Sequence, residues 1–256
     1  MNNGQPAVWA NGLVRRFGDK TAVDGVDLAI MPGEFYGLLG PNGAGKTTTI
    51  RMIVGLLRPD AGRAGIGNID TWVDPTAAKR RIGVLPEEFN LYERLTGEEL
   101  LDFTSAVHGL SAIQAAERRD ELMSLLDLEM DARKVIGEYS RGMRKKVALA
   151  AAVIHAPEVL FLDEPFEGVD AVSARLIRRL LQTYTERGAT VVFSSHVMEL
   201  VERLCTRIGI MVAGKLLVEE TRPELLSRYQ AANVEEAFLA AVGADERSGG
   251  LEWLNT

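Results

Sequence analysis

The chain alternates between short apolar runs of strand length and segments whose apolar residues recur with a helical period. Short runs rich in Leu, Val and Phe, flanked by turn residues, are typical of strands buried on both faces of a parallel sheet. The clearest strands are predicted at residues 34–40, 81–86, 158–164 and 189–195. This alternation predicts an α/β fold with a largely parallel sheet.

The two ends of the chain carry different patterns. Residues 1–30 predict strands joined by a turn, which would form a smaller, antiparallel β layer. Residues 207–220 predict a hairpin that turns near Ala213 and Gly214. After residue 221 we expect two short helices, at 223–230 and 233–243, followed by a loose tail at 244–256.

Between residues 97 and 156 the pattern is helical, with Ser111 as a plausible N-cap and no convincing strand. We therefore expect a helical subdomain of about residues 97–156, inserted between two strands of the core. On this division residues 1–225 form a single domain, and residues 226–256 form a C-terminal helix and a flexible tail.

Within this insertion, residues 138–154 predict a helix that Ser140 caps, with a basic, solvated face at residues 144–146. Gly142 is unexpected there, because glycine within a helix costs about 1 kcal/mol relative to alanine. A glycine in a first turn is understandable if another group must approach the backbone closely.

Composition narrows the class of protein. Hydrophobic residues make up 46% of the 256 positions and charged residues 25%, which is ordinary for a globular chain. The net charge of −7 argues against general attraction to nucleic acid, which we do not expect as a partner, or to an anionic membrane surface. The single Cys205 excludes an internal disulfide framework. Without an apolar run of roughly 18 residues or a signal peptide, we expect a soluble intracellular protein.

The most specific motif lies at residues 40–49, after a predicted strand and before an amphipathic helix. It fits G-x-x-x-x-G-K-[ST] from Gly40 to Thr47, so consecutive backbone N–H groups would curl around a phosphate chain. Lys46 would reach the terminal phosphates, and the Thr47 hydroxyl would bind Mg²⁺. The alternative is a glycine-rich turn that matches by chance. The nucleotide-binding residues expected here are Gly40, Pro41, Asn42, Gly43, Ala44, Gly45, Lys46, Thr47 and Thr48.

Two further strand ends carry candidate catalytic groups. Asp163 suits a contact with Mg²⁺, and Glu164, one residue further, could act as general base toward a water. His196 directly follows another buried strand, where a γ-phosphate contact would be built. A solvated strand end and a structural histidine are the alternatives, and the complete phosphate loop argues against both.

Together these motifs resemble the nucleotide-binding subunit of the ATP-binding-cassette (ABC) transporter family, over about residues 7–240. Residues 139–143, here called the signature segment, resemble that family's signature motif, whose common form begins Leu-Ser-Gly-Gly. Ser140 and Gly142 match the motif. The positions that depart from it are Tyr139, Arg141 and Met143.

The resemblance implies a P-loop NTPase core with a parallel sheet, an N-terminal antiparallel β layer and a helical insertion. It also implies a dimer, either of two copies or with a paralogous cassette, that holds two ATP molecules head to tail. Ser140 and Gly142 would then contact the γ-phosphate of ATP bound to the partner. A side chain at position 142 would block that approach, which accounts for the glycine.

Further family positions follow from the resemblance. Phe17 falls where an aromatic residue usually stacks on adenine, and Asp170 matches an aspartate of the loop along the dimer interface. Glu87 stands where most members have a glutamine near the metal, in a loop that also faces the membrane subunits. The resemblance therefore places Glu87 with Thr47 and Asp163 at the Mg²⁺, although a carboxylate adds charge to an anionic site.

The resulting hypothesis is an ATPase subunit that drives a separately encoded integral membrane permease, more similar to exporters than to importers. Lys46, Glu164 and His196 would carry the hydrolysis of ATP. The chain would be cytoplasmic and held at the inner face of the membrane by the permease. The alternatives are an ABC-type ATPase that acts on the ribosome or on nucleic acid, and a regulatory module that binds nucleotide without hydrolysis.

Overall fold

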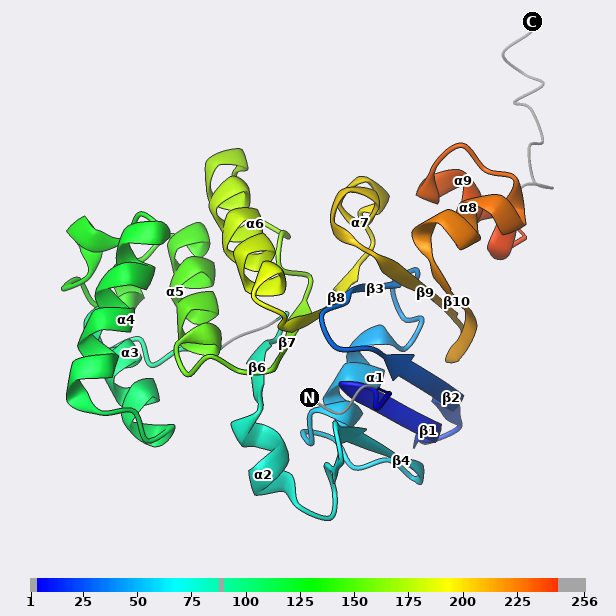
Figure 1. The fold of residues 1–256 in the computed structure, drawn as a ribbon, viewed down its shortest axis with the longest axis horizontal. Helices are drawn as coiled ribbons and strands as arrows, with labels where there is room; N and C mark the ends of the chain where they lie inside the picture. Colours follow the sequence, from blue (N-terminus) through cyan, green and yellow to red (C-terminus); the bar gives the residue numbers. More distant parts are fainter. Residues whose placement is uncertain (1–3, 88–89, 244–256) are drawn as a thin grey trace, which may run out of the picture.

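A computed structural model describes residues 4–87 and 90–243 of the chain, and it contains two β-sheets with helices around them (Figure 1). The larger sheet has six strands in the order β10-β9-β3-β8-β7-β6. The smaller sheet has four strands in the order β2-β1-β4-β5. The predicted α/β fold with a separate antiparallel layer is confirmed.

The larger sheet is parallel except at one edge. Its strands are β3 (Phe35–Leu39), β6 (Ile82–Leu85), β7 (Val159–Asp163), β8 (Thr190–Ser195), β9 (Arg207–Val212) and β10 (Lys215–Thr221). Only β10 runs antiparallel to its neighbour, because it forms with β9 the hairpin that turns at Ala213 and Gly214. All the strands predicted from the apolar runs are present. Every residue of β3 and β7 is buried, as expected for strands that are covered on both faces.

Two hydrophobic clusters lie on the two faces of this sheet, and alternate residues of its strands enter each of them. Along β8, Val192 packs into one cluster and Phe193 into the other. Helix α1 (Lys46–Ile53) lies in the first cluster, between the two sheets. The second cluster contains the helices of the opposite face: α5 (Arg141–Val153), α6 (Ala171–Glu186), α7 (Met198–Leu204), α8 (Arg222–Tyr229) and α9 (Val234–Ala241).

The smaller sheet is formed by β1 (Val8–Phe17), β2 (Lys20–Ile30), β4 (Ala61–Ile66) and β5 (Ile69–Asp70). The first two strands were predicted, but β4 was missed because its sequence, AGRAGI, is rich in small residues and shows little of the apolar alternation of a strand. Gly65 explains part of this composition. A Cβ at Gly65 would lie 2.4 Å from the ring of Trp9, so the close approach of β1 requires a glycine.

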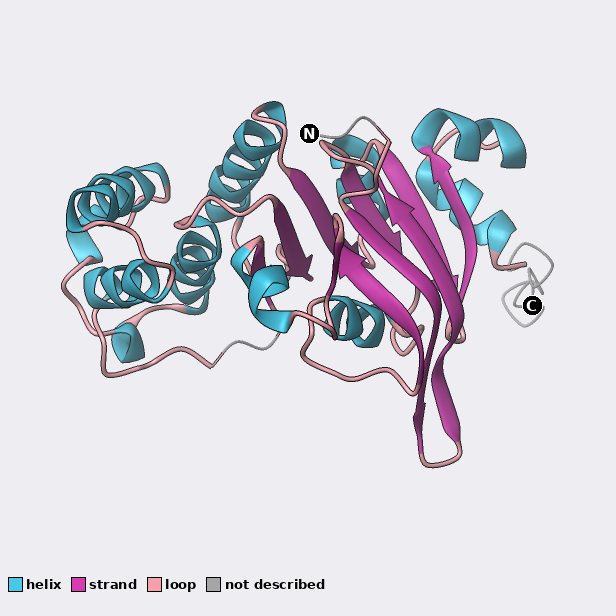
Figure 2. Ribbon diagram, turned by 60° about the horizontal axis from the view of Figure 1, so that its bottom comes forward, coloured by secondary structure: helices cyan, strands magenta, loops and turns pink. Residues whose placement is uncertain are grey.

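The helical insertion comprises α3 (Gly97–Val107), α4 (Ala112–Leu125), two short 3₁₀ turns and α5. These helices lie together beyond the β6 edge of the larger sheet, on the same side in both views (Figures 1 and 2). Within the part of the chain that the structure describes, the only bridge formed by this segment outside the named strands joins Thr96 to Val135. The predicted helical insertion is therefore confirmed.

Near the C-terminus, α8 and α9 occupy the positions of the two predicted helices. The expected boundary at residue 225 falls inside α8, so the division into residues 1–225 and 226–256 remains a prediction. The expected flexible tail at 244–256 lies outside the described residues. Among the residues described, no helix has both the length and the apolar character needed to cross a bilayer.

Candidate active site

The loop between β3 and α1 forms the centre of the site, at the carboxyl ends of the parallel strands. Gly45 is the N-cap residue of α1 and has a φ of 106°. A Cβ at this position would also meet the carbonyl oxygen of Ala22 at 2.4 Å, so only glycine fits. No side chain caps the helix. Its first N–H groups and the positive end of its dipole are thus available to an anion.

Lys46 folds back over this loop. Its Nζ donates to the carbonyl oxygens of Gly40, at 2.6 Å, and of Pro41, at 3.4 Å. Burial lowers the pKa of the Lys46 ammonium, while the charges of Glu164, Asp163 and Glu87 act in the opposite direction. The lysine is therefore a buried cation among carboxylates, which a phosphate chain could draw away from the loop carbonyls.

A cavity of about 410 Å³ opens beside the loop and brings together segments that are far apart in the sequence. It is lined by Phe17, Lys20, Ala22, Asn42, Gly43, Ala44, Gly45, Lys46, Thr47, Thr48, Glu87, Glu164, Glu167 and His196. Most of the predicted site residues thus meet in one place. Those outside the lining are Gly40, Pro41, Asp163, Ser140 and Gly142. Lys20, Ala22 and Glu167 were not predicted, because no sequence motif marks them.

Phe17 lies at the mouth of this cavity, at the end of β1. It is 48% exposed, which is high for a large aromatic side chain. The guanidinium of Arg15 lies 4.9 Å from the centre of the ring, a cation–π distance. The guanidinium lies over one face of the ring, and the exposed part of the ring is accessible to a flat ligand.

The carboxylate pair at the end of β7 is held by the neighbouring strand β8. Asp163 accepts a short hydrogen bond from the hydroxyl of Ser194, which is opposite it in the parallel register. The same Ser194 Oγ accepts from the backbone N–H of Glu164 at 3.2 Å. Ser194 was not predicted, because nothing in the sequence of β8 distinguishes it from a strand serine.

Glu164 has a φ of 47°, in the left-handed region that side chains other than glycine rarely adopt. Such a conformation costs on the order of 1–3 kcal/mol and is found mainly where function requires it. The Oε1 of Glu164 lies 3.0 Å from Nδ1 of His196. An ionised carboxylate can only accept, so this contact places the proton on Nδ1 and leaves Nε2 for another partner.

The signature segment lies at the start of α5. Ser140 is exposed and caps the helix by accepting from the N–H of Met143 at 3.2 Å. A Cβ at Gly142 would meet Asp170 Oδ2 at 3.5 Å and Ser173 Oγ at 3.7 Å, which are ordinary contacts. Among the residues that the structure describes, none therefore requires glycine at position 142.

The expectation of a solvated basic face at 144–146 was wrong for two of its three residues. Lys145 is 2% exposed and Lys146 is 6% exposed. Their long aliphatic stems are buried, and each ammonium binds backbone carbonyls instead of water. Lys145 Nζ donates to the oxygens of Glu164, at 2.5 Å, and Glu167, at 3.0 Å.

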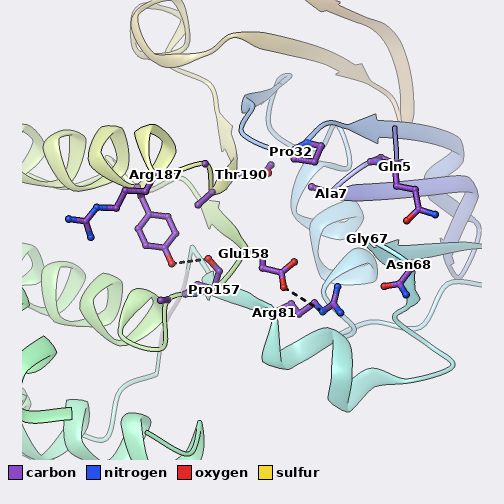
Figure 3. A pocket seen from close by; sticks show the side chains of 15 residues that line it. Gln5, Ala7, Pro32, Gly67, Asn68, Arg81, Pro157, Glu158, Arg187 and Thr190 are labelled. Atoms are coloured by element: carbon purple, nitrogen blue, oxygen red, sulfur yellow. Dashed lines mark hydrogen bonds and ion pairs between the residues drawn. The ribbon is translucent and has the colours of Figure 1, made fainter. Parts of the chain in front are cut away.

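A second cavity, of about 510 Å³, lies at the opposite, amino-terminal ends of β6, β7 and β8 (Figure 3). Its walls include the Arg81–Glu158 ion pair at 3.6 Å and Tyr184, whose hydroxyl donates to the Pro157 carbonyl at 2.8 Å. It contains no glycine loop and no carboxylate pair. The phosphate loop and the carboxylate pair thus lie at the opposite end of the strands from this cavity.

Comparisons with known proteins identify the family. A family model described as ABC transporter matches residues 23–167. The chain is 38% identical over 241 residues to the linearmycin resistance ATP-binding protein LnrL of Bacillus subtilis, covering 91% of this chain and 78% of that protein. It is also 38% identical to the ABC transporter ATP-binding protein NatA of the same organism, over 87% of this chain and 91% of that protein.

Solved structures show the same likeness. The structure of an ATP-binding subunit of an ABC transporter superposes with a TM-score of 0.87 at 27% identity, covering 92% of this chain and 99% of that one. A dimeric ATP-binding cassette in a post-hydrolysis state, bound to ADP and phosphate, gives a TM-score of 0.76 at 28% identity. The latter match covers 84% of this chain and 98% of the other.

Proposed function

Since this chain belongs to the ABC transporter family, as a subunit that binds and hydrolyses ATP, we propose that it powers export through a separately encoded membrane permease. Relatives named for resistance to linearmycin and to daunorubicin support the direction of transport. The permease would hold the chain at the inner face of the membrane.

An exposed apolar surface on the helical insertion supports the permease as a partner. The exposed rings of Tyr92 and Phe103 form an edge-to-face pair with centroids 5.8 Å apart. Val107, at the end of the same helix α3, is also exposed. Contiguous exposed aromatic side chains are typical of protein-binding surfaces. This pair follows the loop of Glu87 in the chain, so a docked permease would contact a segment that lines the ATP cavity.

We assign the nucleotide contacts as follows. Lys46 would leave the carbonyl of Gly40 and bind the terminal phosphates, while the open N-terminus of α1 receives the phosphate chain. Phe17 would stack on the adenine, since its ring is exposed at the cavity mouth.

The oxygen donors around the cavity fit Mg²⁺, which prefers hydroxyl, carboxylate and phosphate oxygens. Thr47 and Glu87 line the cavity, and the buried Asp163 carboxylate lies at the adjacent strand end. These residues would hold the ion, directly or through water. When bound, Mg²⁺ neutralises charge on the phosphates.

For hydrolysis, Glu164 would take a proton from the attacking water as general base. Its backbone is fixed by Ser194, and its carboxylate is oriented by His196. With Nδ1 of His196 engaged by the carboxylate, Nε2 is left to contact the γ-phosphate or the attacking water.

One observation supports the sharing of sites between two copies: Gly142 carries the helix cost of a glycine, although its own chain has room for a Cβ. In a head-to-tail dimer, Ser140 and the N–H of Gly142 would approach the partner's γ-phosphate. The likeness to a dimeric cassette structure supports the same arrangement. Each site would then need two copies.

The test uses Glu164→Gln, which keeps the shape of the base and should trap the ATP-bound dimer. With ATP and Mg²⁺ this variant should elute earlier on gel filtration. Adding Gly142→Asp should abolish the dimer and leave ATP binding to the monomer intact, because the new carboxylate would face the partner's γ-phosphate. Met130→Asp, an exposed change elsewhere in the insertion, is the matched control and should still dimerise. A double variant with Gly142→Asp that still dimerises would refute the shared site.

The partner is tested separately. Phe103→Glu should lose co-purification with membrane proteins and retain ATP hydrolysis, because Phe103 lies outside the ATP cavity. Recovery of the wild-type chain with ribosomes instead of a membrane fraction would favour the alternative of a ribosome-associated ATPase.

A further inference from the structure

Helix α5 carries two buried lysines side by side, and their ammonium groups reach different parts of the chain. Lys146 Nζ donates to the carbonyl oxygen of Asp127 at 3.1 Å, within the helical insertion. Lys145 points to the core, where it binds the carbonyls of Glu164 and Glu167. Burying an ammonium is costly unless its hydrogen bonds are satisfied, so each contact has a structural reason.

The two carbonyls bound by Lys145 belong to the first and last residues of the segment that carries the general base. Residues 164–167, here called the Glu164 turn, follow β7, and the N–H of Glu167 donates to the Glu164 oxygen at 3.2 Å. Lys145 Nζ binds the carbonyl at each end of this turn. The turn begins with the left-handed φ of Glu164, a conformation that persists only when surrounding contacts hold it.

The charges around this ammonium are those of the active site. Burial lowers the pKa of Lys145, and the carboxylates of Glu167, Glu164 and Glu87 oppose that shift, while Arg141 adds to it. Lys145 is thus in electrostatic contact with the base and with the Glu87 loop. Its side chain therefore connects the helix of the signature segment to the catalytic edge of the same copy.

We infer that Lys145 is a positioning residue for ATP hydrolysis, which fixes the Glu164 turn to the helix that begins at the signature segment. The inference rests on the proposed shared site. Ser140 and Lys145 are five residues apart on one rigid helix, about 7 Å along its axis. The helix that completes the partner's ATP site thereby also orients the base of its own site.

The test compares Lys145→Met with Lys146→Met in the full chain. Methionine keeps most of the aliphatic stem and removes the ammonium. Lys146 is the matched control, because it lies on the same helix, is similarly buried and binds a carbonyl that is not part of the Glu164 turn. Lys145→Met should lower kcat about 10- to 100-fold and leave KM for ATP within about twofold, as expected for a misplaced base. Lys146→Met should keep the wild-type kcat. Lys145→Arg, which retains cationic donors, should recover part of the loss.

A second measurement separates positioning from folding and from ATP binding. Combined with Glu164→Gln, Lys145→Met should still form the ATP-dependent dimer, unlike the combination with Gly142→Asp. If Lys145→Met does not fold, Lys145→Gln takes its place, with one shorter donor and the same expected loss in kcat. An unchanged kcat, or an equal loss in Lys146→Met, would overturn the inference. Absence of ATP hydrolysis in the wild-type chain would instead refute the proposed function.

Discussion

Two helices of the helical insertion and the helix of the phosphate loop, at the carboxyl edge of the core sheet, differ in how their N-termini are capped. Helices α3 and α4 both begin with complete capping boxes, formed by Thr96 with Glu99 and by Ser111 with Gln114. Helix α1 begins at a left-handed glycine, without any side-chain cap. Helices α3 and α4 cap their own first turns, whereas α1 leaves its first donors for a ligand. The difference shows that backbone N–H groups without a partner in the same chain can mark a ligand-binding site.

The backbone conformation of buried charged residues differs between the two regions as well. The carboxyl edge buries Lys46, Asp163 and Glu164, and Glu164 adopts a left-handed conformation. In the insertion, Asp127 also has a positive φ, but it lies in the turn just after α4 and its carbonyl is bound by Lys146. Helices α3 and α4 of the insertion are therefore organised for stability, and the carboxyl edge for chemistry. Substitutions in the two regions should separate stability from activity.

The largest effect is expected for Glu164→Gln. Loss of the general base should reduce the rate of hydrolysis about 10²- to 10⁴-fold, because the amide cannot accept a proton from water. ATP affinity should remain near that of the wild type. Phosphate release and nucleotide titration measure the two quantities. Glu167→Gln, a carboxylate that lines the same cavity, is the control. Comparable losses in both variants would mean that Glu164 is not the base.

Lys46→Ala should weaken ATP binding about 10- to 100-fold, the value of one charge-assisted hydrogen bond to a phosphate, about 1.5–3 kcal/mol. Without nucleotide the variant should be at least as stable as the wild type. Burial lowers the pKa of Lys46, which means that burying its charged form costs free energy in the folded state. Thermal unfolding with and without ATP distinguishes the two effects. Lys20→Ala, an exposed lysine that lines the same cavity, should bind ATP far better; equal losses would argue against the assigned role.

A pH titration tests the stability of the insertion, where His155 stacks on His108 with centroids 3.6 Å apart. Burial, followed by the charge of His108, lowers the pKa of His155 from 6.5 to about 4. Between these values the unfolded chain binds more protons than the folded one, so stability should fall as the pH drops from 6.5 toward 4. The loss should be about 2 kcal/mol, given about 1.4 kcal/mol per pKa unit and partial solvation of the ring.

Urea unfolding at several pH values measures this dependence. His155→Gln cannot titrate, so its stability should depend less on pH in that interval. Parallel curves for the variant and the wild type would contradict the assignment.

The smallest effect belongs to the cap of α3. Thr96→Ala removes the hydroxyl that accepts from the N–H of Glu99 at 3.1 Å and should lower stability by about 1 kcal/mol. Thr96→Ser keeps the acceptor and should be nearly neutral. ATP affinity should be the same in all three proteins. A change in affinity with Thr96→Ala would show that the insertion and the edge are not separable in this way.

Sequence alone predicted the features that depend on local pattern. The buried strands and the phosphate loop were identified because apolar runs and glycine spacing are properties of neighbouring residues. Features that depend on tertiary neighbours were missed. Ser194 acts on Asp163 only through the register of β7 with β8, and the strand β4 is defined by the approach of Trp9 to Gly65.

The burial of Lys145 and Lys146 also depends on tertiary neighbours and was not predicted. Lysine favours solvent on average, so a helical pattern places both on an exposed face. In the folded chain their stems cross a buried surface, and each ammonium binds a carbonyl that the sequence cannot locate. Which carbonyl each one binds decides whether the residue serves the active site or the insertion.

The shared site around Gly142 predicts how an altered gene behaves beside a normal one. If each ATP site is formed by both copies, a mixed dimer of a Gly142→Asp chain and a normal chain, unlike a dimer of two altered chains, keeps one intact site and loses only the site that holds the normal chain's ATP. The defect is then expressed in the partner, so the altered gene should act dominantly when it is expressed beside the normal one. A chain with a damaged phosphate loop would instead lose the site that holds its own ATP. It would leave the partner's site intact, because its signature segment is unchanged. Two chains with these complementary defects, paired in one dimer, should restore a single working site.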